Sequence, residues 1–253
     1  MSTPPPATAA RVLLIGATSA IAHAVAREYA GRGARLMLVG RRLDALNANA
    51  ADLRVRGAAE VEVATLDADR IDEHAAVIAQ AWERWGGFDV ALLAHGTLPD
   101  QTQAQASVAA TLACLQTNAT SVIALLTELA NRFEAQRSGV IGVISSPAGD
   151  RGRASNYVYG AAKAAVTNFA SGLRHRLFAS GVRVVTVLPG FVDTPMTASF
   201  PKGPLWAKPE RVAADIVNAL DRRNGKLYTP WFWRWIMAIV LHLPPALFLH
   251  SRL

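Results

Sequence analysis

Short apolar stretches alternate with longer amphipathic stretches along most of this chain. Apolar stretches bounded by turn residues are typical of strands buried on both faces, and a hydrophobic period of about 3.6 residues is typical of helices. The predicted strands cover residues 12–15, 36–39, 61–66, 90–94, 140–145 and 182–188, with a last strand at 226–230. The predicted helices cover residues 20–32, 43–56, 72–85, 108–136, 161–179 and 209–223. This alternation predicts an α/β fold, a doubly wound parallel sheet of about seven strands with helices on both faces.

The organisation of the chain favours one large domain. No repeat or linker divides the 253 residues, of which 51% are hydrophobic. We expect a flexible tail at residues 1–10, one folded domain at 11–230 and an apolar, basic segment at 231–253. A single cysteine, Cys114, excludes an intramolecular disulfide and a multi-cysteine metal site, and it favours a reducing compartment. The first residues lack the pattern of a signal peptide, so we expect a cytoplasmic protein. We also expect no metal site.

The net charge of +7 narrows the partners that the chain could have. Such a charge suits nucleic acid, a membrane surface or an anionic substrate. The arginines are scattered and aromatic residues make up only 7%, so we expect no nucleic-acid partner. Basic residues near the C-terminus favour the inner face of a membrane as the alternative.

The first predicted strand runs directly into a turn, residues 16–22, that opens a helix. Such a turn directs backbone N–H groups and a helix N-terminus at a pyrophosphate, as in Rossmann-like folds. Alanines stand at positions 20 and 22, where glycine is usual, and an ordinary strand–helix turn is the alternative. The candidate contacts are Gly16, Thr18, Ser19 and Ile21.

Two arginines, Arg41 and Arg42, follow the second predicted strand. A site for NAD(H) normally places an acidic residue there, to bind the ribose 2′-hydroxyl. Guanidinium groups suit a 2′-phosphate instead, so the sequence favours NADP(H) over NAD(H). A solvated pair of charges that opens the next helix is the alternative.

Tyr159 and Lys163 are four residues apart in a predicted helical region, and Ser146 lies upstream. Residues at this spacing share a helix face, so the Lys163 ammonium is expected to lower the pKa of Tyr159 from about 10. A tyrosine with a lowered pKa can exchange a proton with a carbonyl or alcohol oxygen, which the Ser146 hydroxyl would polarise. A helix-face pair without a catalytic role is the alternative.

Together these motifs resemble the short-chain dehydrogenase/reductase family over about residues 11–230. The resemblance implies a nicotinamide-dependent oxidoreductase that interconverts a ketone and a secondary alcohol, and a homo-oligomer. It implies that Ser146, Tyr159 and Lys163 are catalytic and that Asn118 positions a proton-relay water. It also implies cofactor contacts at Tyr159, Lys163, Asp67, Ala94, Gly96, Pro189, Val192 and Thr194, the last two to the nicotinamide carboxamide.

The sequence departs from the family where Leu93-Ala94-His95-Gly96 replaces the usual Asn-Asn-Ala-Gly. We expect His95 to be a packing or hydrogen-bonding residue. A narrower resemblance, in the turn at 16–22, the residues before Lys163 and the C-terminal segment, is to reductases of a keto-sugar carried on a polyprenyl phosphate. Reduction of a small soluble or acyl-chain ketone is the alternative, and so is a nucleotide-sensing module without catalysis.

The C-terminal segment, residues 231–253, is strongly apolar. Its uninterrupted run at 236–241 is much shorter than the ~20 residues that a spanning helix needs, and Pro244-Pro245 should end a helix. Three tryptophans beside arginine suit a membrane interface. A pocket wall, an oligomer contact or a membrane-bound scaffold are the alternatives. We also expect a substrate loop at 196–208.

Overall fold

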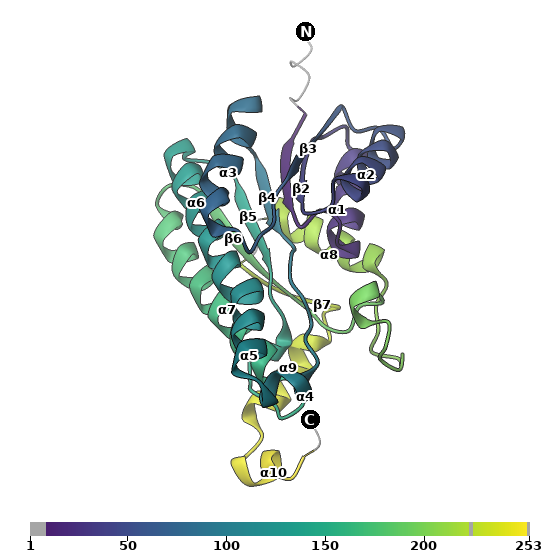
Figure 1. The fold of residues 1–253 in the computed structure, drawn as a ribbon, viewed down its shortest axis with the longest axis vertical. Helices are drawn as coiled ribbons and strands as arrows, with labels where there is room; N and C mark the ends of the chain where they lie inside the picture. The colour runs from purple at the N-terminus through teal and green to yellow at the C-terminus, as the bar shows by residue number, and fades with distance from the viewer. Residues whose placement is uncertain (1–8, 223–224, 252–253) are drawn as a thin grey trace.

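In this computed structural model, seven strands form one sheet in the order β3-β2-β1-β4-β5-β6-β7 (Figure 1). Residues 9–222 and 225–251 are described, so residues 1–8 of the predicted tail lie outside the described residues. All six pairings are parallel, so the carboxyl ends of the strands meet at one edge. The predicted fold is confirmed. The strands are β1 (Arg11–Ile15), β2 (Arg35–Gly40), β3 (Glu60–Thr65), β4 (Val90–Leu93), β5 (Val140–Ile144), β6 (Arg183–Pro189) and β7 (Lys226–Thr229).

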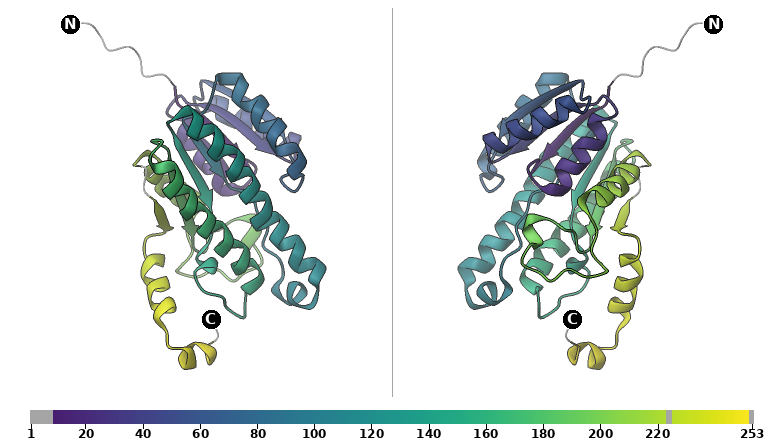
Figure 2. Two further views of the ribbon diagram at one scale, coloured as in Figure 1. Left: turned by 90° about the vertical axis from the view of Figure 1, so that its left-hand side faces the viewer. Right: turned by 90° about the vertical axis from the view of Figure 1, so that its right-hand side faces the viewer.

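Two layers of helices cover the two faces of the sheet (Figure 2). Successive β1 side chains point to opposite faces: Val12 and Leu14 belong to one buried cluster, and Leu13 and Ile15 to the other. The first cluster includes side chains of α1 (Ala20–Ala30), α2 (Leu43–Val55) and α8 (Pro209–Asp221). The second includes side chains of α3 (Ile71–Trp85), α6 (Ser121–Gln136) and α7 (Tyr157–Phe178). Burial on both sides explains why the strands between the two edge strands, β3 and β7, are mostly continuous apolar runs.

Helix α7 begins at Tyr157, four residues before the predicted start at residue 161. The expectation was wrong because Gly160 does not interrupt the helix. Its N–H donates to the Asn156 carbonyl at 2.8 Å, and it is buried against Ala148. A Cβ at position 160 would lie 2.7 Å from the Ala148 carbonyl oxygen, so glycine permits the close contact between α7 and the segment after β5.

The predicted helix at 108–136 consists of α5 (Val108–Leu115), a π-helical turn (Gln116–Thr120) and α6. Among the residues described, this is the one helical segment long and apolar enough to cross a membrane by length and composition. Its α6 half packs Leu125, Leu129 and Phe133 into the core beside the sheet, as a core helix does. The short α4 (Gln101–Ala106) was not predicted, and it begins where the Asp100 carboxylate accepts from the Gln103 N–H.

The C-terminal segment forms α9 (Trp233–His242) and α10 (Pro245–Leu249), which project below the carboxyl edge of the sheet (Figure 1). The predicted break at the proline pair is confirmed, because α9 ends at His242 and Pro245 begins the next helix. Arg151, in the segment after β5, holds the end of α9: its Nη1 donates to the carbonyls of Val240 at 2.5 Å and Leu243 at 3.0 Å. The same guanidinium lies 3.7 Å from the Phe248 ring centroid.

Candidate active site

The turn after β1 brings the N-terminus of α1 to the carboxyl edge of the sheet. Gly16 has φ +77°, and a Cβ there would lie 2.5 Å from the His95 backbone nitrogen, so only glycine fits. Ser19 caps α1, with its hydroxyl accepting from the Ala22 N–H at 3.1 Å. Thr18 and Ile21 lie in the same turn and in the first helical turn after it. This geometry suits a bound anion above the strand end.

The ends of β2 and β3 are neighbours, because the Leu66 N–H donates to the Gly40 carbonyl. Arg41 and Arg42 therefore follow one strand and Asp67 the next. Both arginines are exposed, and within residues 9–222 and 225–251 neither guanidinium makes a hydrogen bond or an ion pair. Asp67 accepts from the Asp69 N–H at 3.2 Å. The two arginines are thus available to an anionic ligand.

The residues at the end of β4 contact both the Gly16 turn and helix α6. The Ala94 N–H donates to the Ile15 carbonyl at 2.8 Å, which places Ala94 and Gly96 beside the Gly16 turn. His95 Nε2 lies 3.0 Å from the Ser121 hydroxyl, as expected for a hydrogen-bonding residue. Burial, assisted by the nearby Lys163 charge, lowers the pKa of His95 to about 3. This imidazole therefore stays neutral.

Asn118 lies in the π-helical turn and is fully buried. Its Oδ1 accepts from the Thr97 N–H at 2.9 Å, and its Nδ2 donates to the Cys114 carbonyl at 3.1 Å. A Cβ at Gly96 would lie 2.8 Å from Asn118 Oδ1 and 3.6 Å from Lys163 Nζ, so Asn118 and Lys163 flank the same glycine. Irregular π turns of this kind are frequent at functional sites.

Tyr159 and Lys163 lie on α7 facing the end of β5, where Ser146 follows the strand. Lys163 Nζ donates to the Ile144 carbonyl at 3.0 Å and lies 5.6 Å from the Tyr159 ring centroid. Burial lowers the pKa of Lys163 to about 8. Burial also raises the pKa of Tyr159, and a hydrogen bond to Ser146 opposes that rise. The expected lowering of the Tyr159 pKa by Lys163 is therefore wrong for this structure, because burial raises this pKa more than the hydrogen bond to Ser146 lowers it.

The segment after β6 also lies at the carboxyl edge of the sheet, on the side of β5 away from β1. The Gly190 N–H donates to the Thr229 carbonyl, and Val192 pairs with Ala207. Thr194 caps a short 3-10 turn (Pro195–Thr197) at the start of the predicted substrate loop. Pro189, Val192 and Thr194 thus lie at the same edge as the other candidate residues, at the end of the strand next to β5.

Sequence reasoning missed Gln101, Arg151, Arg153 and Cys114 as residues near this edge. Cys114 clusters with Val158 and Tyr159. Two arginines between Ser146 and Tyr159 were a visible signal, since that segment connects two candidate catalytic residues. Gln101 carried no signal, because its position depends on how α4 folds back onto α7.

The sequence matches the family described as short chain dehydrogenase over residues 10–204. The chain belongs to this short-chain dehydrogenase family. An uncharacterized oxidoreductase of Mycobacterium tuberculosis is 39% identical over 94% of both chains. Another, from Streptomyces coelicolor, is 35% identical, again over 94% of each chain. As a short-chain dehydrogenase, the protein is an oxidoreductase.

Solved structures of short-chain dehydrogenases share the fold. A variant of actinorhodin polyketide ketoreductase, solved with NADPH, has a TM-score of 0.79 and 25% identity, and covers 87% of this chain and 95% of its own. Levodione reductase has a TM-score of 0.80 at 22% identity, covering 88% and 97%. Both are similar in the Rossmann-like arrangement of seven parallel strands between two helical layers.

Proposed function

We propose that this short-chain dehydrogenase reduces a ketone to a secondary alcohol with NADP(H). The observation that carries the proposal is the meeting of Ser146, Tyr159 and Lys163 at the carboxyl edge of the sheet, beside the Gly16 turn. When bound, a reduced nicotinamide supplies hydride to the carbonyl carbon. Gly16, Thr18, Ser19 and Ile21 would face its pyrophosphate, and Asp67, Ala94 and Gly96 its adenosine and ribose. Pro189, Val192 and Thr194 would hold the carboxamide.

Tyr159 supplies the proton in the reductive direction. Because burial raises its pKa, the hydroxyl stays protonated and can donate to the oxygen of a ketone. The Ser146 hydroxyl donates a second hydrogen bond to that oxygen and so polarises it. Lys163, a buried cation beside the tyrosine, stabilises the phenolate after transfer and can bind a ribose hydroxyl. Asn118 holds the relay that restores the proton.

The preference for NADP(H) is supported by the exposed arginine pair after β2. Arg41 and Arg42 can both reach a 2′-phosphate without first giving up an ion pair within the described part of the chain. The ketoreductase with a TM-score of 0.79 was solved with NADPH. NAD(H), which usually needs an acidic residue at this position, is the less favoured cofactor.

For the substrate we propose a ketone on a lipid, with a keto-sugar on a polyprenyl phosphate as the specific candidate. The support is the narrower resemblance to decaprenylphosphoryl-2-keto-ribose reductase in the Gly16 turn, in the residues before Lys163 and in the C-terminal segment. A small soluble or acyl-chain ketone is the alternative substrate, and a panel containing both kinds separates them.

The exposed side chains of the C-terminal segment support the proposal that the enzyme binds the inner face of a membrane. Trp231, Trp235 and Ile239 follow one another at four-residue spacing and are each more than 60% exposed, while Trp233 and Met237 on the other side of α9 are buried. Leu247 and Leu249 of α10 are also exposed. No acidic residue follows position 221. Tryptophan beside arginine without nearby carboxylates fits an anionic bilayer surface. We name Trp231, Trp235, Ile239, Leu247 and Leu249 the apolar face.

Replacement of Tyr159 by Phe tests the proposed reaction. The variant keeps the ring and loses the hydroxyl, so the fold and NADPH binding should survive while ketone reduction falls on the order of 10²-fold or more. NADPH oxidation with a ketone panel measures turnover, and fluorescence titration measures cofactor binding. Cofactor binding without turnover on any ketone by the unmodified protein would support a nucleotide-sensing module instead.

A further inference from the structure

Within the described residues, three buried polar atoms without partners belong to side chains that contact or precede the first turn of α7. They are Gln101 Nε2, Arg153 Nε and Asn156 Oδ1. Gln101 reaches this turn from α4, where its Oε1 accepts from the Val158 N–H at 3.3 Å. The Asn156 N–H donates to the Arg153 carbonyl at 3.0 Å. Gln101 thus contacts the first turn of α7, and Arg153 and Asn156 come directly before that turn in the chain. Buried polar groups left unpaired are costly.

Arg153 is the unusual member, because its charge has no counter-ion within residues 9–222 and 225–251. The described residues provide its guanidinium with no hydrogen bond and no ion pair. Burial lowers its pKa, and the Asp150 carboxylate opposes this. Asp150 is itself engaged, accepting from the Tyr228 hydroxyl at 2.8 Å and from Lys226 Nζ at 3.2 Å.

Arg151 shows that the same segment can satisfy an arginine when the role is structural. Its guanidinium donates to carbonyl groups at the end of α9 and stacks on Phe248. Arg153 differs in having none of these partners. A partly desolvated cation that the described residues leave unpaired, in the segment that connects Ser146 to Tyr159, is a candidate for ligand binding.

We propose that Arg153 binds an anionic group of the substrate, a phosphate or a carboxylate, next to the ketone that Tyr159 protonates. The Gln101 amide donates a second hydrogen bond to the same anion, and Asn156 Oδ1 accepts from a neighbouring hydroxyl. This specificity rests on the proposed ketone reduction, since it places the anion on the same substrate. Guanidinium suits both anions because it offers paired N–H donors.

Matched substrates test the proposal. Dihydroxyacetone phosphate is compared with dihydroxyacetone, and levulinate with its methyl ester. The expected result is a higher kcat/KM for the charged member of at least one pair. Arg153→Gln should remove that preference, with a loss on the order of 10- to 100-fold through KM, while the neutral ketones change little. Arg153→Lys should restore part of the preference, and Arg176→Gln, an exposed arginine on α7, serves as the matched control.

A ketone carried on a long-chain alkyl phosphate, presented in detergent, separates a lipid phosphate from a free one. A larger Arg153 effect on the alkyl phosphate than on dihydroxyacetone phosphate assigns the site to lipid-borne substrates, and the reverse assigns it to free ones. Equal losses on charged and neutral ketones in the Arg153→Gln variant would overturn the proposal, as would the absence of any preference in the unmodified enzyme.

A binding measurement keeps the subsite testable if the protein reduces none of these ketones. Calorimetric titration with inorganic phosphate should show one binding event that Arg153→Gln removes and Arg41→Asp retains, because any phosphate bound at Arg41, in the proposed 2′-phosphate site at the end of β2, is a separate event. Phosphate binding unchanged by Arg153→Gln overturns the subsite. Loss of the proposed reaction alone, with Arg153-dependent phosphate binding intact, overturns only the proposed function. Thermal unfolding should show Arg153→Gln at least as stable as the unmodified protein, since the unpaired charge is gone.

Discussion

A single buried imidazole at the end of β4 couples the stability of this protein to pH. His95 is held neutral by burial, and its pKa lies at about 3 against an ordinary 6.5. The unfolded chain therefore binds this proton more readily than the folded one across that interval. Stability contributed by neutral His95 is fully present above about pH 6.5 and falls as the pH drops toward 3.

Replacement of His95 by Gln should remove this pH dependence. The amide can still hydrogen-bond to the Ser121 hydroxyl but does not titrate. From pH 7 to pH 5, the unmodified protein should lose on the order of 2 kcal/mol more unfolding free energy than the variant. Urea unfolding at both values measures the difference, with His175→Gln, on the exposed face of α7, as control. Parallel pH profiles for the unmodified protein and the His95 variant would disprove the role of this imidazole.

Single residues should also determine which cofactor, NADPH or NADH, the enzyme prefers. In Arg41→Asp, a carboxylate should repel the 2′-phosphate and accept from the ribose 2′-hydroxyl of NADH. The unmodified enzyme should show a lower KM for NADPH than for NADH, and the variant should narrow or reverse the gap. Steady-state kinetics with both cofactors on one ketone decides the matter. A native preference for NADH would show that the arginine pair is only surface charge.

At the scale of elements, Arg151 connects the segment after β5 to the C-terminal helices. Arg151→Gln removes the donors to the end of α9 and the contact with Phe248, which together stabilise this docking by about 1–3 kcal/mol. Hydrogen exchange over α9 and α10 should accelerate, while α8 exchanges as before and provides an internal reference. Arg176→Gln is the matched control. Unchanged exchange in α9 would mean that Trp233 and Met237 alone hold the helix.

Element type could be predicted from the sequence more fully than element boundaries. Every predicted strand and helix has an observed counterpart, because buried parallel strands are continuous apolar runs and the helices are amphipathic. The start of α7 was missed because Gly160 serves a close contact with Ala148 that no local pattern reveals. The π turn was missed for a similar reason. The pKa of Tyr159 and the unpaired Arg153 depend on desolvation by residues distant in sequence, so their chemistry required the folded structure.

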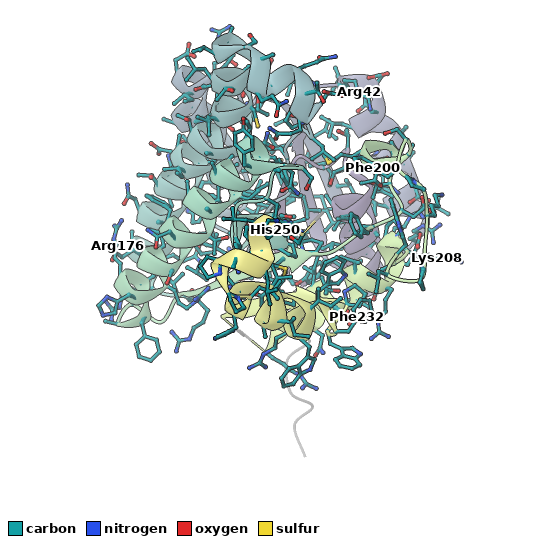
Figure 3. The ribbon with its side chains drawn as sticks, turned by 90° about the horizontal axis from the view of Figure 1, so that it is seen from below. Arg42, Arg176, Phe200, Lys208, Phe232 and His250 are labelled. Atoms are coloured by element: carbon teal, nitrogen blue, oxygen red, sulfur yellow. The ribbon has the colours of Figure 1, made fainter. Side chains whose placement is uncertain are left out.

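At the scale of the whole molecule, α10 projects below the carboxyl edge of the sheet, where the candidate catalytic residues meet (Figures 1 and 3). Loop residues Phe191 and Phe200, which follow β6, are exposed as well. Exposed apolar side chains of two separate segments thus lie after strands that end at this edge. A bilayer that covered the apolar face would bring its own lipids close to the site.

Two double variants test membrane binding. Trp235→Ser with Ile239→Ser removes the centre of the apolar face, and Phe178→Ser with Val55→Ser removes two apolar side chains from α7 and α2 that are exposed at least to a similar degree. The unmodified protein should float with phosphatidylglycerol-containing vesicles, less so in high salt. The first variant should lose binding on the order of 10-fold or more, and the second should not. No flotation of the unmodified protein, or an oligomer that only the first variant breaks, would assign the apolar face to another partner.

The π-helical turn at Gln116–Thr120 changes the direction in which side chains point along one continuous helical segment, so that α5 and α6 present different faces. Each residue of a regular helix turns by about 100°, so one residue more in a turn rotates all that follows by roughly that angle. Cys114 can therefore face Asn118 while Leu129 and Phe133 face the core beside the sheet. Deletion of one residue here would make the helix regular. The side chains of either α5 or α6 would then rotate away from their present contacts. The number of residues in this turn is thus constrained more strictly than their identity, because that number sets the orientation of α6 relative to α5.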